Sequence, residues 1–289
     1  MKITTAQRKR AKIRLSIQGP SGSGKTFSSL LIAKGLVGNW ENICVIDTEN
    51  HSADLYSHLG PYNVLTLGKP FNPEAYCQAI ELCEQSGMKA IIIDSLSHEW
   101  EGDGGILDIH AGMVGNSFTN WSKVTPRHNS LIQRILQSDC HIIATFRTKQ
   151  DYVLSDKNGK MVPEKVGLKS VTKDGMDYEF TTVFDLDIHH NAVCTKDRTG
   201  LFGSSPLKLD TIIGDKILRW CEVSTVNTSL TMEEAFEPTL EELVAAAKTV
   251  NELVAIWNKF EPSKTNLQLF VQRKLQIESE GRKSNGVHE

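Results

Sequence analysis

A glycine-rich segment near the start of the chain carries residue types suited to binding phosphate. Residues 13–26 read IRLSIQGPSGSGKT, an alternating apolar run that leads into Gly19 and, after four residues, into Gly24, Lys25 and Thr26. Glycines let successive backbone N–H groups curl around a polyphosphate without Cβ clashes, and a following helix presents its positive dipole end there. We therefore predict a phosphate-binding loop in which Lys25 reaches the β- and γ-phosphates and the Thr26 hydroxyl holds Mg²⁺. The predicted loop consists of Gly19, Pro20, Ser21, Gly22, Ser23, Gly24, Lys25 and Thr26.

A second apolar segment ends in a carboxylate that could complete a metal site. Residues 89–94 read KAIIID, with three β-prone isoleucines before Asp94. An aspartate at the carboxyl end of a strand beside a phosphate loop can orient a Mg²⁺-bound water. We predict Thr26 and Asp94 as the metal-binding residues. An aspartate that only caps a turn is the structural alternative.

The water that attacks a phosphoryl group needs a general base, and three glutamates are candidates. Glu49 follows the acidic end of another strand-like segment, residues 42–47, which places it just beyond the strand tip. Glu99 and Glu101 lie shortly after residue 94. Residue chemistry alone does not choose among the three.

Residues 147–178 form a polar stretch that is too long for an ordinary connection in a compact domain. Between residues 147 and 174 it has seven basic residues against four acidic ones. Cations suit phosphates and an aromatic ring suits a base, so the composition fits single-stranded nucleic acid. A solvated hairpin without a ligand explains the same charges equally well. The candidate DNA-binding residues are Arg147, Lys149, Tyr152, Lys157, Lys160, Lys165, Lys169 and Lys173.

The elements that must position these residues alternate between strand and helix in the first half of the chain. This rhythm is typical of a parallel sheet covered on both faces. We predict strands at 13–18, 42–47, 62–66, 89–94 and 140–146, and helices at 26–36, 52–59, 73–85 and 127–137. Antiparallel strands near 180–188 and 191–196 precede a closing helix at 210–221. The predicted fold class is α/β with a mostly parallel central sheet.

The C-terminal part of the chain has a different pattern. After a core at 1–222, residues 223–238 are predicted to be a linker. Thr239 and Thr249 each precede a glutamate by three positions, the capping-box spacing that begins a helix. Amphipathic spacing follows, which predicts a small α-helical domain at 239–277. Residues 278–289 are predicted to be disordered.

Composition excludes several classes of protein. The chain of 289 residues has a formal net charge of −3, so any nucleic-acid site must be a local patch. No apolar run approaches about 18 residues and no signal-peptide pattern is visible, so we expect a soluble, cytoplasmic protein with no membrane partner. The six cysteines include no CxxC pair, which favours reduced packing residues over a zinc site.

Several motifs together resemble those of RecA-type recombinases. GPSGSGKT, IDTEN, IIIDS, TFRTKQDYV, KVGLK, DGMDYEF and TKDRTG look like a family of small phage-encoded RecA-like P-loop ATPases, some assigned to single-strand annealing and recombination alongside a single-stranded DNA-binding protein. The resemblance covers roughly residues 10–222. It implies a RecA-like core that binds ATP and Mg²⁺, with Glu49 as the catalytic base. About a dozen residues precede the first predicted strand, so the N-terminal helix through which RecA proteins polymerise is not expected, and filament formation is not implied.

The resemblance also implies roles for segments beyond the phosphate loop. Thr145 and Arg147 match the polar tip of a strand that senses the γ-phosphate, and residues 147–178 match a principal DNA-contacting loop. The glycine-rich stretch 101–120, which we expect to be mobile, matches the first DNA loop of RecA-like proteins. It contains no lysine or arginine, which weakens that match.

Two cations late in the core complete the comparison. Lys196 and Arg198 match residues that reach across a subunit interface to a neighbour's ATP, which implies a homo-oligomer with ATP at its subunit interfaces. The predicted function is a DNA-stimulated ATPase that acts on single-stranded DNA in phage recombination or annealing, in the cytoplasm of a bacterial host cell. An ATP-switched replication or helicase-loading adaptor that acts through a protein partner is the alternative. A nucleotide or small-molecule kinase fits less well, because its lid is usually arginine-rich and the basic stretch here is lysine-rich.

Overall fold

The computed structural model describes residues 11–157, 160–222, 240–260 and 267–284. The chain divides into two compact units, Met1–Thr225 and Val226–Glu289. Among the described helices, none is both long enough and apolar enough to cross a membrane.

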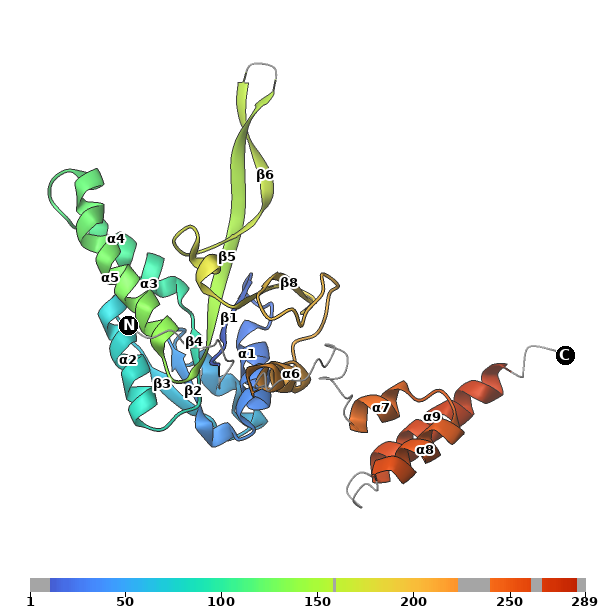
Figure 1. Ribbon diagram of the computed structural model, residues 1–289. Helices are drawn as coiled ribbons and strands as arrows, with labels where there is room; N and C mark the ends of the chain where they lie inside the picture. The colour runs from blue at the N-terminus through green and yellow to red at the C-terminus, as the bar shows by residue number, and fades with distance from the viewer. Residues whose placement is uncertain (1–10, 158–159, 223–239, 261–266, 285–289) are drawn as a thin grey trace, which may run out of the picture. The chain divides into compact units, whose positions relative to one another are not determined.

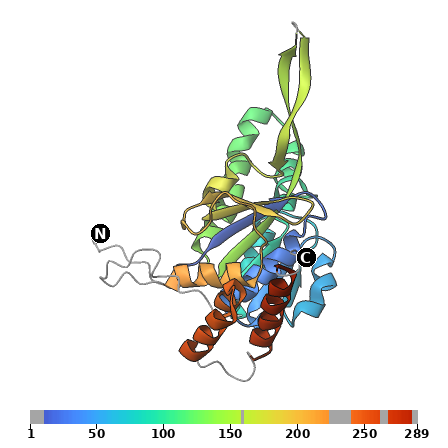
Figure 2. The same ribbon diagram turned by 90° about the vertical axis from the view of Figure 1, so that its right-hand side faces the viewer.

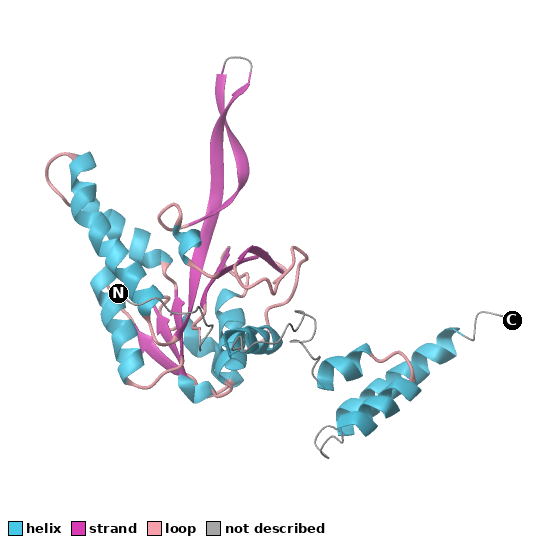
Figure 3. Ribbon diagram, in the orientation of Figure 1, coloured by secondary structure: helices cyan, strands magenta, loops and turns pink. Residues whose placement is uncertain are grey.

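The first unit is built around a sheet that has eight strands in the described residues (Figures 1 and 3). The strands are β1 (Arg14–Gly19), β2 (Ile43–Asp47), β3 (Asn63–Thr66), β4 (Ala90–Asp94), β5 (His141–Lys157), β6 (Lys160–Ser170), β7 (Thr182–Leu186) and β8 (Ala192–Asp197). Their order is β3-β2-β4-β5-β1-β7-β8, and β6 pairs with β5. All neighbours from β3 to β7 in this order are parallel, whereas β7 with β8 and β5 with β6 are antiparallel. The predicted α/β class with a mostly parallel sheet is confirmed.

Helices cover both faces of this sheet (Figure 1). They are α1 (Lys25–Val37), α2 (Pro73–Gln85), α3 (Ser97–Glu101), α4 (Ile106–Ala111), α5 (Ser117–Gln137) and α6 (Thr211–Glu222), with short 3₁₀ turns η1 (Trp40–Asn42), η2 (Ser52–Leu59) and η3 (Met176–Glu179). On one face, Ile91 and Ile93 of β4 share a buried cluster with Tyr76 of α2 and Leu131 of α5. On the other, α1 and α6 cross closely, since a Cβ on Gly35 would lie 2.1 Å from the Thr211 carbonyl oxygen.

The structure corrects one of the predicted helices in the first half of the unit. Helix α5 begins at Ser117 rather than at residue 127, and Pro126 lies inside it. Residues 52–59 form a helix as predicted, of the 3₁₀ type. The stretch 101–120 contains α4 and the start of α5, and His110 stacks on Trp121 with ring centroids 4.2 Å apart. The mobility of this stretch stays a prediction.

The polar stretch after residue 146 is not the loop that we predicted. It continues β5 and returns as β6, with a register from Thr148 opposite Ser170 to Lys157 opposite Lys160 and an irregularity near Asp151. This hairpin projects from the unit in both views (Figures 1 and 2). A two-stranded ribbon lacks the buried face that produces an apolar alternation, which is why the segment reads as a loop. The signal that could have revealed it is Asn158-Gly159, a hairpin-turn dipeptide that lies outside the described residues.

The second unit contains three described helices, α7 (Leu240–Ala246), α8 (Val250–Phe260) and α9 (Leu267–Ser284). Val244, Ala247, Leu253 and Phe270 form its buried cluster. The Glu252 backbone N–H donates to the Thr249 hydroxyl (3.3 Å), as the capping-box spacing predicts. Helix α9 extends to Ser284, although we expected disorder from residue 278. The predicted linker at 223–238 lies outside the described residues.

Candidate active site

The parallel register brings the carboxyl ends of four strands to one edge of the sheet. β2 and β4 pair Asp47 with Asp94, and β1 and β5 pair Gly19 with Arg147. The segments that leave these strands line a cleft of about 980 Å³. In open α/β sheets, ligands bind at this edge. Of the residues predicted from sequence, those that line the cleft are Ser21, Gly22, Gly24, Lys25, Thr26, Glu49, Asp94 and Arg147.

The predicted phosphate loop joins β1 to the first turn of α1. Gly22 and Gly24 have φ of 78° and 86°, in the left-handed region that glycine adopts without strain, and Gly24 is the N-cap of α1. The first N–H groups of a helix have no intrahelical acceptor, so they are available to an anion. The buried Ser23 hydroxyl has no hydrogen-bond partner within the described chain. A polyphosphate suits this loop because it supplies acceptors for these donors.

Lys25 folds back onto the phosphate loop. Its ammonium group donates to the carbonyl oxygens of Gly19 (3.0 Å) and Pro20 (2.9 Å). Burial lowers its pKa, and the nearby charge of Asp94 opposes that shift. A phosphate group would offer Lys25 a charged acceptor in place of two neutral carbonyls, which is a stronger hydrogen bond.

Thr26 and Asp94 meet as a hydroxyl–carboxylate pair suited to Mg²⁺. The Thr26 hydroxyl donates to Asp94 Oδ2 (2.5 Å), and the Thr145 hydroxyl donates to Asp94 Oδ1 (2.6 Å). Asp94 is only 2% exposed, and this burial raises its pKa, while its two hydrogen-bond donors act in the opposite direction. Mg²⁺ prefers oxygen ligands and keeps several waters. Thr26 and Asp94 would hold the ion, whereas Thr145, which does not line the cleft, acts through Asp94.

Replacing Asp94 with asparagine is expected to raise the stability of the nucleotide-free chain while weakening Mg²⁺-dependent nucleotide binding. Because burial raises the pKa of Asp94, the wild type loses stability as the pH rises from the usual aspartate pKa to the raised one. At neutral pH, asparagine removes the buried charge, and a gain of about 1 kcal/mol would raise the melting temperature by about 2–4 °C. Thermal unfolding of wild type and Asp94→Asn without metal measures this rise in melting temperature. Asp94→Ala, which loses both hydroxyl partners, should unfold at lower temperature, and a similar loss in Asp94→Asn would contradict the argument.

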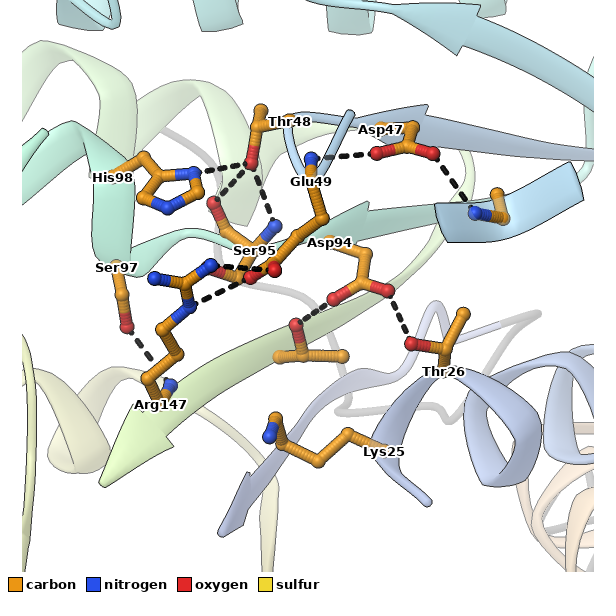
Figure 4. Close-up of polar contacts among 12 residues, drawn as sticks. Lys25, Thr26, Asp47, Thr48, Glu49, Asp94, Ser95, Ser97, His98 and Arg147 are labelled. Carbon is orange, nitrogen blue, oxygen red and sulfur yellow. Dashed lines mark hydrogen bonds and ion pairs between the residues drawn. The ribbon is translucent and has the colours of Figure 1, made fainter. Parts of the chain in front are cut away.

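Glu49 reaches the same edge from the segment after β2. Asp47 shapes that segment, because its carboxylate accepts from the backbone N–H groups of Glu49 (2.6 Å) and Ala53 (2.9 Å). Glu49 forms two parallel hydrogen bonds with Arg147, at 2.8 Å from Nε and 2.5 Å from Nη2 (Figure 4). Burial acts to raise the pKa of Glu49, but the hydrogen bonds and charge of Arg147 outweigh it and leave the pKa below its usual value. A carboxylate that stays charged beside the phosphate loop can accept a proton from water.

The two rival glutamates lie elsewhere. Glu99 is 1% exposed and forms a hydrogen bond with the buried His128, at 3.0 Å from its Nδ1. Glu101 pairs with Lys149 at 3.3 Å. In the described chain neither residue lines the cleft, so the geometry favours Glu49 as the base.

A polar network that the sequence analysis missed ties these strand ends together (Figure 4). The Thr48 hydroxyl accepts from the Ser95 backbone N–H (2.8 Å) and lies 2.8 Å from His98 Nδ1. The Arg147 backbone N–H donates to the Ser97 hydroxyl (3.0 Å). These contacts fix three parts of the chain relative to one another: the end of β2, the segment that follows β4, and β5. Glu49, Asp94 and Arg147 are therefore held in one arrangement.

A comparison with protein families agrees with this geometry. The model of a family described as AAA domain matches residues 11–207. The chain belongs to the AAA domain family. This is a family of P-loop ATPases that bind ATP with Mg²⁺. The matched segment contains the phosphate loop and all the strand ends described above. No curated protein matches the chain.

The cleft of this AAA domain has further walls that the sequence analysis missed. Phe27 of α1 and Tyr56 of η2 form a tilted aromatic pair with ring centroids 5.9 Å apart, and both line the cleft. An aromatic surface of this kind suits a nucleobase. His190 and Lys208 line it from later in the chain. No local pattern marks these residues, because they become neighbours only when η2, the β7–β8 turn and the segment before α6 converge.

The predicted intersubunit cations lie outside the cleft of their own AAA domain. Lys196 donates to the carbonyl oxygens of Asp177 (2.8 Å) and Tyr178 (2.6 Å), and Arg198 also donates to Tyr178 (3.1 Å). Burial lowers the pKa of Lys196, and the neighbouring Arg198 acts in the same direction. Both cations are thus anchored to η3, and their own nucleotide cleft does not include them.

The predicted DNA-binding residues follow the hairpin and its base. Lys169 pairs with Asp174 at 2.7 Å, and Lys173 and Lys169 line a separate hollow of about 310 Å³ together with Lys196. Among the predicted DNA-binding residues whose side chains the structure describes, only Arg147 lines the nucleotide cleft. The side chains of four others lie outside the described residues, although their backbone lies in β5 and β6; they are Tyr152, Lys157, Lys160 and Lys165.

Proposed function

We propose that this P-loop ATPase is stimulated by DNA and acts on single-stranded DNA in phage recombination or annealing. The observation that carries the proposal is the course of β5. This strand runs from the nucleotide cleft, where Thr145 contacts Asp94 and Arg147 contacts Glu49, directly into the projecting hairpin. A ligand on the hairpin therefore has a direct physical connection to the residues predicted to perform hydrolysis.

At the cleft, each residue has a distinct part in hydrolysis. Bound Mg²⁺ would neutralise charge on the β- and γ-phosphates. Lys25 and the loop N–H groups bind the phosphates, and Thr26 and Asp94 hold the metal ion. Glu49 orients the attacking water and accepts its proton on a lone pair that the two hydrogen bonds from Arg147 leave free.

The register of the hairpin supports an anionic ligand. Lys157 lies opposite Lys160 at the far end, and Lys149 lies opposite Lys169 near the base. Like charges at directly opposed positions destabilise a strand pair, and a polyanion removes this repulsion. The exposed ion pairs of Lys149 and Lys169 are weak competitors because water screens them.

The proposal extends to assembly. Lys196 and Arg198 lie outside their own cleft and close to the surface, which is compatible with action on the ATP of a neighbouring copy. Cations supplied by a second subunit stabilise the transferring phosphoryl group only when that subunit is docked, so hydrolysis would depend on assembly. A single-stranded DNA-binding protein is proposed as a further partner.

Removing charge from the hairpin is expected to reduce DNA stimulation without changing basal hydrolysis. In Lys157→Gln/Lys160→Gln, two phosphate contacts are lost, so the slope of log affinity against log salt should become shallower by about 1.4 for single-stranded DNA. Hydrolysis and DNA binding are measured across a salt series for this variant and for the wild type. Lys34→Gln on α1 is the matched control, because it removes a lysine far from the hairpin in sequence. Unchanged stimulation and slope in the hairpin variant would contradict the DNA assignment.

A feature of the second unit favours the alternative of an ATP-switched adaptor. Leu267, Val271 and Leu275 recur every four residues along α9 and are exposed, whereas Phe270 faces the core of that unit. An exposed apolar stripe of this kind suits a protein partner. If hydrolysis is indifferent to single-stranded DNA even at low salt, the adaptor becomes the better explanation.

A further inference from the structure

The turn between β7 and β8 is built to present one residue at its apex. Asp187 accepts hydrogen bonds from the backbone N–H groups of His189 (2.8 Å) and Asn191 (2.8 Å), and its own backbone carbonyl accepts from His190 N–H (3.1 Å). His190 has a φ of 62°, a left-handed conformation that is uncommon for a residue with a Cβ. The turn is therefore held in one shape by Asp187, and that shape extends His190 toward the phosphate loop.

The His190 ring packs directly on that loop. Its Nδ1 lies 2.9 Å from the Ser23 carbonyl oxygen, and a Cβ on Gly24 would lie 3.0 Å from the same nitrogen. A carbonyl oxygen only accepts, so Nδ1 is assigned the proton. Nε2 is then an acceptor in the neutral ring and a second donor in the imidazolium. Within the described chain, Nε2 has no hydrogen-bond partner.

The surroundings of His190 are those of a phosphate site. His190 lines the nucleotide cleft, and the Lys208 ammonium group, which also lines it, donates to the His189 carbonyl oxygen (2.6 Å). The turn and Lys208 thus form one continuous part of the cleft wall. The charged groups around the cleft are Lys25 from α1, Glu49 after β2, Asp94 from β4, Arg147 from β5, and Lys208 and Asp210 before α6.

We infer that His190 is a further nucleotide-binding residue, whose Nε2 contacts the phosphate groups held by the loop. This inference rests on the proposed binding of ATP in the cleft. Protonated His190 donates from both ring nitrogens, one to the loop and one to the phosphate, and such a charge-assisted hydrogen bond strengthens binding. The contribution of His190 to affinity should therefore be confined to ligands that carry phosphate groups.

The test compares the affinity for a non-hydrolysable ATP analogue with Mg²⁺ with the affinity for adenosine, which carries no phosphate. His190→Asn keeps a residue that tolerates the left-handed turn and can still donate to Ser23, but it has no Nε2 to reach a phosphate. The readout is the ratio of wild-type to His190→Asn affinity for each ligand. We expect a ratio of about ten for the analogue and about one for adenosine.

His189→Ala is the matched control, because it lies in the same turn and its side chain does not line the cleft. It should bind both ligands as the wild type does. A ratio of wild type to His190→Asn that is the same for the analogue and for adenosine would overturn the inference. A wild type that binds the analogue no better than Lys25→Ala would instead show that the proposed ATP site is wrong.

Discussion

Lys25→Ala is expected to lower the rate of ATP hydrolysis by at least about 10²-fold, the effect of losing one positioned donor to a developing charge. The side chain is partly buried and already held over the phosphate loop by two carbonyl oxygens, so it is positioned before the nucleotide arrives. Alanine removes the charge and leaves the loop glycines unchanged. Hydrolysis and analogue binding, each with and without single-stranded DNA, measure the effect.

The control for this prediction is Lys34→Ala, which removes a half-buried lysine from the last turn of the same helix, outside the cleft. It should hydrolyse ATP at the wild-type rate. If Lys25→Ala and Lys34→Ala have equal rates, the cleft described above is not where hydrolysis occurs.

Glu49→Gln and Glu99→Gln are expected to have opposite effects on rate and stability. Glu49 is the carboxylate in the cleft, so glutamine should lower the turnover rate by about 10²–10⁴-fold while analogue binding is retained. Glu99 is buried against His128, and weakening a buried hydrogen bond costs about 1–3 kcal/mol of folding free energy. Glu99→Gln should therefore unfold at lower temperature but, below that temperature, turn over at close to the wild-type rate.

Single-turnover hydrolysis and thermal unfolding of both variants separate the two roles. Arg147→Ala adds a further comparison, because it frees the Glu49 carboxylate without removing it. A large loss of turnover in Glu99→Gln together with near-normal turnover in Glu49→Gln would reverse the assignment of the base.

Local sequence patterns were sufficient to predict the fold class and the phosphate loop. The loop depends on glycines at fixed spacing and on a strand and helix that flank it directly, and all of these signals lie within about fifteen consecutive residues. The same holds for β4 and Asp94, because an apolar run followed by a carboxylate is a short-range signal. Such short-range patterns did not predict α4, which packs against residues distant in sequence. They also did not predict the hairpin of β5 and β6, because a two-stranded ribbon has no buried face to produce an apolar alternation.

The sequence by itself determined that the chain has a phosphate loop, a strand-end aspartate and several candidate bases. Only the tertiary structure decided which of these meet. The parallel register placed Glu49 beside Arg147 and buried Glu99 against His128, and the β7–β8 turn carried His190 onto the loop from 166 positions beyond Gly24. The physical reason is that periodicity reports the conformation of a segment and the face it buries, whereas the contacts of a strand tip depend on which strands pair and in what register.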